Sequence, residues 1–213
     1  MPVVGPCSTV ATMKLYYAPG TCSLSPHIAL MEAGLPFEAV RVSTKTHQLA
    51  DGGDYHRINP KGYVPTLEFA DGSRLTEGPA IVQWIADQRP ERRLAPPAGT
   101  MERYRLVEWL NFVSTELHKQ YSPLFNPKMP EEAKALFRDK LKQRCAWVDG
   151  QLSGHSFLLG EDFSVADGYL YVVTRWARPS GVDLSGLGHL DAFMARVAAR
   201  PAVQQAQQAS DPR

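Results

Sequence analysis

The pattern of apolar and polar residues divides the chain into two parts of different character. In the first part, short apolar runs alternate with segments of helical spacing. The pattern predicts strands over residues 13–17, 37–42, 64–69 and 73–76, and helices over residues 23–33 and 78–88. The first strand, helix and strand have the length of a right-handed parallel crossover, and Asp71-Gly72 is a two-residue hairpin signal. The polar, glycine-rich residues 43–62 predict a mobile loop or a short helix.

The second part of the chain has the spacing of amphipathic helices throughout. Leu106, Leu110, Val113 and Leu117 form an apolar stripe on a long helix over residues 101–121. Further helices are predicted over residues 130–152, 164–176 and 189–200. The charged, proline-rich residues 91–100 mark a linker. We therefore expect an α/β domain over residues 13–90 and an all-helical domain over residues 101–213.

Composition and charge exclude several classes of protein. The 213 residues include 44% hydrophobic residues, and 23 Lys and Arg stand against 22 Asp and Glu. Such a chain is globular, and its near-neutral charge gives no reason to expect binding to nucleic acid or to an anionic membrane. Prolines interrupt the weakly charged N-terminal stretch, which lacks the unbroken apolar core of a signal peptide or a membrane span. Residues 1–12 are interpreted as an irregular extension.

The chain contains three cysteines, Cys7, Cys22 and Cys145, which cannot all pair within one molecule. The odd number argues against a disulfide framework and for a reducing compartment, which we expect to be the cytoplasm. Cys145 has the helical spacing of a core residue, and Cys7 lies in the extension as an incidental thiol.

Cys22 lies between the end of the first strand and the start of the first helix. The free N–H groups of a helix start favour a thiolate over a thiol, so this position predicts a lowered cysteine pKa and a nucleophilic or redox role. The alternative interpretation is a small buried apolar residue at a loop. The position alone does not favour either.

Two other features of the α/β part suit a ligand. A proline at the start of a strand, as in Val64-Pro65, is either a trans edge proline or a cis proline that turns the Val64 backbone toward a ligand. Glu77 and Gly78 open the second helix, where Glu77 stabilises the helix or binds an ammonium while the Gly78 N–H binds a carboxylate. Together with Cys22, they suit a small peptide that carries a carboxylate and a sulfur.

Asn111, Thr115 and His118 form a polar stripe on the long helix of the second part. His118 is either a hydrogen-bond partner for a thiolate or ligand, or an ordinary histidine between packed elements. The histidines and cysteines lack the spacing of metal ligands, so no metal is expected. The chain has no glycine-rich nucleotide-binding loop.

Five ordered segments together resemble the bacterial beta-class glutathione S-transferases, over about residues 13 to 205. These segments are KLYYAPGTCSLSPHIAL, INPKGYVPTL, LTEGPAIVQWIAD, EWLNFVSTELHKQYSPLF and FSVADGYL. The resemblance implies a thioredoxin-like N-terminal domain of βαβαββα order, an all-α C-terminal domain and a homodimer. It also implies a detoxifying transferase that joins the thiol of glutathione, its co-substrate, to small hydrophobic electrophiles.

The resemblance assigns catalytic roles to Cys22 and His118. The positions implied to bind glutathione are Thr21, Cys22, Lys45, His47, Tyr63, Val64, Pro65, Glu77, Gly78, Asn111, Thr115, His118 and Lys119. Among them, Val64-Pro65 is implied to be cis, Lys45 or His47 to hold the glycyl carboxylate, and Lys119 to act from either subunit. The resemblance further implies a short helix within residues 43–62 and an N-capping box formed by Ser164 and Asp167.

Two other functions remain open at this point. One is a glutathione-dependent thiol-disulfide oxidoreductase or peroxidase that acts through Cys22. The other is a non-catalytic protein that binds hydrophobic ligands. In the transferase, four aromatic residues of the helical part are candidates for the wall of the electrophile site, although they are equally typical of core: Phe112, Tyr121, Phe125 and Trp176.

Overall fold

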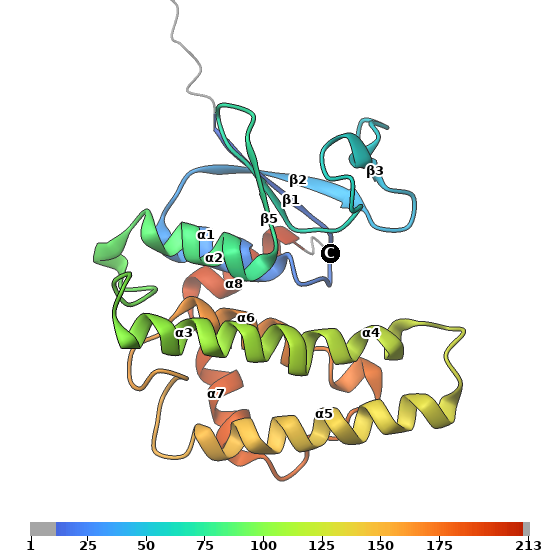
Figure 1. Cartoon of the computed structure of the whole chain (residues 1–213), viewed down its shortest axis with the longest axis vertical. Helices are drawn as coiled ribbons and strands as arrows, with labels where there is room; N and C mark the ends of the chain where they lie inside the picture. The colour runs from blue at the N-terminus through green and yellow to red at the C-terminus, as the bar shows by residue number, and fades with distance from the viewer. Residues whose placement is uncertain (1–11, 211–213) are drawn as a thin grey trace, which may run out of the picture.

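The structure is a computed structural model that describes residues 12–210, so Cys7 and most of the predicted extension lie outside the described residues. The chain begins with a five-stranded sheet in the order β3-β2-β1-β4-β5 (Figure 1). Its strands are β1 (Met13–Tyr17), β2 (Phe37–Ser43), β3 (Gln48–Leu49), β4 (Thr66–Glu68) and β5 (Arg74–Thr76). β1 and β2 are parallel, while the other pairs are antiparallel, as the predicted crossover and hairpin require.

Helices α1 (Leu24–Ala33) and α2 (Gly78–Asp87) lie together on one side of the sheet (Figure 1). Both begin and end within a residue of their predicted bounds. The α/β part contains a second, smaller hydrophobic core, in which the fully buried Tyr55 packs with Tyr16, Val42 and Val64. Tyr55 opens the 3-10 helix η1 (Tyr55–Arg57), which takes the place of the short helix expected within residues 43–62. The fold is the thioredoxin-like βαβαββα order, with its second helix reduced to this single turn.

The predicted linker is fastened to both parts of the chain. It holds the short 3-10 helix η2 (Pro90–Arg92), and Leu94 is buried with its carbonyl accepting the Val165 N–H at 2.9 Å. Arg103 donates to the Pro96 carbonyl at 2.8 Å and pairs with Asp87 of α2. The buried residues of the two parts accordingly form one continuous hydrophobic cluster.

The helical part is built on a long helix and its antiparallel neighbour α5 (Figure 1). The long helix runs without interruption through α3 (Met101–Phe112), the π-helix η3 (Val113–His118) and α4 (Lys119–Phe125). The remaining helices are α5 (Glu131–Gln151), α6 (Val165–Thr174), η4 (Arg178–Ser180), α7 (Gly188–Ala198) and α8 (Pro201–Ser210). The π-helix was not predicted, because its i→i+5 hydrogen bonds leave no mark on the apolar pattern.

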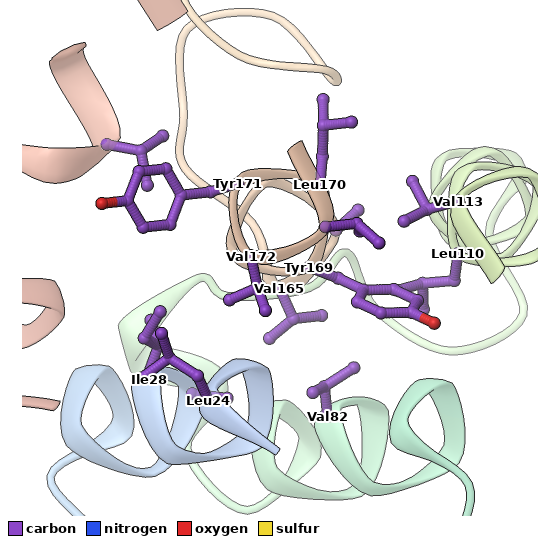
Figure 2. Close-up of a cluster of buried hydrophobic side chains, with 14 of the residues drawn as sticks. Leu24, Ile28, Val82, Leu110, Val113, Val165, Tyr169, Leu170, Tyr171 and Val172 are labelled. Carbon is purple, nitrogen blue, oxygen red and sulfur yellow. The ribbon is translucent and has the colours of Figure 1, made fainter. Parts of the chain in front are cut away.

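Helix α6 lies at the centre of the molecule, and all ten of its residues are buried. Figure 2 shows its apolar side chains directed toward α1 and α2 on one side and toward the long helix on another. Ser164 and Asp167 form the expected capping box at its start. A polar cap is needed here because the orphan N–H groups of a buried helix start have no access to water.

Helix α8 was missed from the sequence, where the glutamine- and alanine-rich tail carried little information. Its buried face consists of Val203, Ala206 and Ser210, which pack toward α1. The Ser210 hydroxyl lies 2.9 Å from Nδ1 of the buried His27 in α1. The C-terminal helix therefore returns to the α/β part and covers it.

We expect His27 to make the stability of the fold fall with acid. Burial lowers the pKa of His27 from 6.5 to about 4. In this pH range His27 is protonated in the unfolded chain but remains neutral in the folded chain. The free energy of unfolding therefore declines as pH falls from about 6.5 to about 4. This histidine contributes a loss of about 3 kcal/mol across that window.

The check is the slope of the free energy of unfolding against pH, from urea titrations. His27→Gln should reduce this slope by the amount that corresponds to about one proton fewer taken up on unfolding. His155→Gln, which alters an exposed histidine, serves as the control. An unchanged slope in His27→Gln would contradict the account.

None of the helices formed by residues 12–210 is both long and apolar enough to span a bilayer.

Candidate active site

The loop between β1 and α1 is held by hydroxyl groups on both sides of Cys22. Thr21 Oγ1 donates to the Ala18 carbonyl at 2.9 Å and lies 2.7 Å from Ser23 Oγ. The Ser23 hydroxyl is fully buried and accepts the Ala18 N–H at 3.1 Å. Thr21 was predicted in a ligand-binding role, and Ser23 was missed. These bonds give the loop one conformation and place Cys22 directly before Ser23, the N-cap of α1.

The Cys22 thiol points toward the loop that precedes β4. Its Sγ donates to the Val64 carbonyl at 3.5 Å, and the Val64-Pro65 peptide bond is cis, as the resemblance implies. Burial raises the pKa of the Cys22 thiol to about 12, and the charge of Glu77 adds to the rise. The predicted lowering of this pKa is therefore wrong. The loss of hydration around the thiol outweighs its own backbone hydrogen bond, which favours the thiolate.

The Val64 loop is anchored by side chains that the sequence did not single out. The Tyr63 carbonyl accepts hydrogen bonds from Tyr55 Oη at 2.8 Å and from Asn59 Nδ2 at 2.7 Å. The Tyr63 side chain, by contrast, is 69% exposed. The loop thus has a rigid backbone and one large side chain free to contact a ligand.

Lys45 and His47 lie in the turn after β2 and differ in their surroundings. Lys45 is exposed and makes no ion pair or hydrogen bond within residues 12–210. His47 has a φ of 54°, and its ring packs against His56 with 4.5 Å between ring centroids. Its Nδ1 atom is buried without a hydrogen-bond partner.

The His47 and His56 rings lie against Gly62, where a side chain would otherwise be. We therefore expect Gly62→Ala to lower the stability of the fold. A β-carbon there would lie 3.0 Å from both His47 Nδ1 and His56 Nε2, and the φ of Gly62 is +70°. Backbone strain and steric overlap together should lower the free energy of unfolding by about 3 kcal/mol.

The matched control is Gly72→Ala, because Gly72 has a φ of +82° with no atom within 4 Å of an added β-carbon. It carries the backbone strain alone, about 1 kcal/mol. Urea titrations of the two variants measure the difference, and equal losses would show that the histidine pair tolerates the methyl group.

Glu77 and Gly78 lie at the start of α2, as predicted. Glu77 has a φ of 70°, and its exposed carboxylate accepts a hydrogen bond from Lys61 Nζ. The same ammonium donates to Thr76 Oγ1 at 2.9 Å. The Glu77 carboxylate therefore already has a side-chain ammonium as its partner, and its binding of a ligand's ammonium stays a prediction.

The predicted polar stripe does not have one common environment: Asn111 and Thr115 are exposed, whereas His118 is half-buried. Asn111 Nδ2 donates to the Val107 carbonyl and Thr115 Oγ1 to the Asn111 carbonyl, both at 3.0 Å, and both residues are exposed. Lys119 is exposed at the start of α4. His118 is instead half-buried, because a π turn changes the facing of the residues that follow it.

The His118 ring lies among aromatic side chains at the junction of the two parts. Its Nδ1 is 2.5 Å from Tyr169 Oη of α6, and its ring centroid is 5.0 Å from that of Trp176. Burial lowers the pKa of His118 to about 4, with a further lowering by the charge of Lys119. His118 is thus a neutral imidazole at pH 7.

The predicted aromatic wall forms in part. Trp176 packs edge-on against Tyr121 and Phe125 at 5.7 and 5.6 Å between centroids, and its Nε1 donates to the Gly20 carbonyl at 3.0 Å. Phe125 is 55% exposed. Phe112 does not belong to this wall. It packs at 4.7 Å against Trp147 of α5, because its position on α3 faces the neighbouring helix.

The structure thus places Cys22, Glu77, His118 and Trp176 along the junction of the α/β and helical parts. The charge of Glu77 acts on both Cys22 and His118. A protonated thiol, a neutral imidazole, a helix start with a carboxylate and an apolar wall together suit a thiol-bearing peptide and a hydrophobic second molecule. Within residues 12–210, no group of three or more His, Cys, Asp and Glu side chains is arranged to hold a metal ion.

A thioredoxin-like domain joined to a helical domain, with a cysteine before its first helix, defines the class of protein. The family model "Glutathione S-transferase, N-terminal domain" matches residues 20–88, and "Glutathione S-transferase, C-terminal domain" matches residues 112–201. Glutathione S-transferase GstA of Escherichia coli O157:H7 is 46% identical over 194 residues, which cover 91% of this chain and 96% of that protein.

Solved structures agree with this class. The ternary complex of BphK, a bacterial glutathione S-transferase, is 54% identical with a TM-score of 0.91, covering 92% of this chain and 98% of that one. The beta-class enzyme of Sphingomonas chungbukensis is 44% identical with a TM-score of 0.89 and the same coverage. The chain belongs to the glutathione S-transferase family, in its bacterial beta class.

Proposed function

We propose that the chain binds glutathione along the junction of its two parts and transfers the glutathione thiol to a small hydrophobic electrophile. In this assignment, Glu77 and the Gly78 N–H hold the γ-glutamyl end, and the Val64 backbone pairs with the cysteinyl unit. Lys45 or His47 holds the glycyl carboxylate. The other proposed contacts are Thr21, Tyr63, Pro65, Asn111, Thr115 and Lys119.

The glutathione sulfur would lie between Cys22 and His118. The thiol of bound glutathione loses its proton to solvent. The Cys22 S–H turns from the Val64 carbonyl to the resulting anion and stabilises it together with a His118 N–H. The thiolate attacks an electrophilic carbon, a carbon–sulfur bond forms, and the leaving group departs as an anion. The exposed Phe125 and the Trp176 ring give the electrophile an apolar surface.

One observation favours conjugation over disulfide chemistry. The Cys22 thiol is enclosed and donates to the Val64 carbonyl, and burial raises its pKa to about 12. Disulfide exchange requires a cysteine thiolate as the nucleophile, whereas stabilising a glutathione anion requires a cysteine that keeps its proton. The hydrogen bond from Cys22 to the Val64 carbonyl and the raised pKa of its thiol both fit the second requirement.

Cys22→Ala tests this assignment, because the variant loses a hydrogen-bond donor and retains the other groups. We expect conjugation of 1-chloro-2,4-dinitrobenzene to remain within about threefold of the wild type, since one donor of several is lost. Cys145→Ala, which alters a cysteine buried in the helical core, is the control.

The same variants should be assayed for reduction of a glutathione mixed disulfide. If Cys22 is the nucleophile of an oxidoreductase, Cys22→Ala abolishes this activity while Cys145→Ala retains it. Full conjugation together with undiminished disulfide reduction in Cys22→Ala would exclude Cys22 from the site altogether.

We further propose a cytoplasmic homodimer with a role in detoxification. Support for an interface comes from the outer face of α3 and α5, where Met101, Tyr104 and Trp147 are 65%, 62% and 46% exposed. A hollow of about 360 Å³ on this face is lined by Trp109, Phe112 and Trp147 together with the polar residues Arg105, Glu108 and Gln151. Exposed apolar surface of this kind is typical of protein–protein contacts. Sedimentation equilibrium should give twice the chain mass, and a monomer at micromolar concentration would contradict the proposal.

A further inference from the structure

We propose that Tyr169 is a positioning residue for His118: its phenol donates a hydrogen bond to Nδ1 and thereby keeps the proton of the imidazole on Nε2, directed at the glutathione sulfur. The proposal rests on the proposed function for the role of that sulfur. The arrangement of the tyrosine and the histidine does not depend on it.

The contact between the two side chains is short and enclosed. Tyr169 Oη lies 2.5 Å from His118 Nδ1, and the two rings meet edge-on with 5.8 Å between centroids. Tyr169 is 3% exposed. Figure 2 shows its ring extending from α6 toward Leu110 and Val113 of the long helix, with Val82 of α2 across from it. Packing on several sides fixes the hydroxyl beside the histidine, where the Ser114 side chain is its second polar neighbour.

The other ring nitrogen of His118 is available to a ligand. Nε2 has no hydrogen-bond partner among residues 12–210, and it is not one of their buried unpaired polar atoms. The Trp176 ring lies beside the imidazole. Cys22 lies near the Tyr169 phenol, and the charge of Glu77 acts on both His118 and Tyr169. This open nitrogen is the atom to which the proposal assigns the thiol group of glutathione.

Tyr169 and His118 are both neutral, so the direction of their hydrogen bond determines which ring nitrogen of His118 carries the proton. Burial raises the pKa of the Tyr169 phenol above its ordinary value, and the nearby Cys22 adds to the rise. Burial likewise keeps His118 uncharged at pH 7. A neutral imidazole has one N–H, so a phenol that donates to Nδ1 leaves the proton on Nε2. An Nε2–H donor stabilises a thiolate, whereas an Nε2 lone pair would repel it.

Tyr169→Phe is the direct test, because it removes the hydroxyl and retains the ring. We expect kcat for conjugation of 1-chloro-2,4-dinitrobenzene to fall about 10-fold, with KM for glutathione within about twofold, since the γ-glutamyl and glycyl contacts remain. The matched control is Tyr171→Phe on the same buried helix. Its hydroxyl accepts a hydrogen bond from Gln207 of α8, on another side of α6 from Tyr169 (Figure 2), so both constants should stay unchanged.

A double mutant separates positioning from direct contact. His118→Gln retains an N–H donor near Nε2 but has no second ring nitrogen for the tyrosine to bind. Adding Tyr169→Phe to His118→Gln should therefore cause no further loss. An equal 10-fold loss in both backgrounds would overturn the proposal and make Tyr169 a group that acts on the substrate itself.

The tautomer can also be measured without any assay of activity. The ¹⁵N shifts of His118 in the wild-type protein should show Nδ1 without a proton and Nε2 with one, and Tyr169→Phe should mix the two forms. A proton on Nδ1 in the wild type would overturn the proposal. A wild type with the expected tautomer but no conjugating activity would instead contradict the proposed function, so the two failures are distinguishable.

Discussion

Replacing His118 with alanine is expected to lower kcat for glutathione conjugation by about 100-fold, the usual loss when one hydrogen-bond donor to a developing anion is removed. The imidazole is the donor that the helical part brings to the junction, between the rings of Tyr169 and Trp176. Alanine leaves no donor and opens a space that water can enter. The measurement is steady-state kinetics at saturating glutathione.

The pH dependence of the wild type should agree with a neutral histidine. Because burial lowers the pKa of His118 to about 4, protonation of this residue should not affect the rate between pH 8 and about 5.5. His155→Ala, at an exposed histidine outside the junction, should retain full activity. A loss of less than threefold in His118→Ala would show that the imidazole does not act on the sulfur.

Replacing Asp167 with alanine is expected to cause the largest loss of stability, about 3 kcal/mol or more. The fully buried Asp167 carboxylate accepts hydrogen bonds from Leu158 N at 2.8 Å, Ser164 N at 2.8 Å and Ser164 Oγ at 2.6 Å. Alanine leaves all three donors unpaired away from water, at about 1–3 kcal/mol for each group that remains unsatisfied.

This prediction is best measured by urea unfolding at pH 7.5. Burial raises the pKa of the Asp167 carboxyl to about 6, so the group is ionised there. Asp191→Ala in the first turn of α7 is the control, because Asp191 is exposed and its loss should cost below about 1 kcal/mol. If the two variants lost equal stability, the capping box would be no more important than an ordinary surface carboxylate.

Much of the fold could be predicted because it depends on local rules. The strand pattern, the Asp71-Gly72 hairpin and the apolar stripe from Leu106 to Leu117 each report the position of an element. Cys145 was correctly predicted to be core from its spacing, and it is 2% exposed. The cis bond of Val64-Pro65 followed only from the resemblance, since the residues themselves allow both isomers.

The remainder depends on contacts between distant segments. Tyr169 is 51 residues from His118 along the chain, and no spacing rule joins them. The raised pKa of Cys22 depends on the enclosure of its thiol and on Glu77, which a helix-start argument does not include. Helix α8 carried a signal in the spacing of Val203, Ala206 and Ser210, but its meaning depends on α1 lying opposite.

We have proposed that the sulfur of glutathione lies between Cys22 and His118, and a crystal structure with glutathione bound is the decisive experiment. We expect the glutathione sulfur within about 4 Å of both Cys22 Sγ and His118 Nε2, at hydrogen-bond reach for a sulfur acceptor. A glutathione sulfur more than about 7 Å from either atom, beyond the reach of one bridging water, would contradict it.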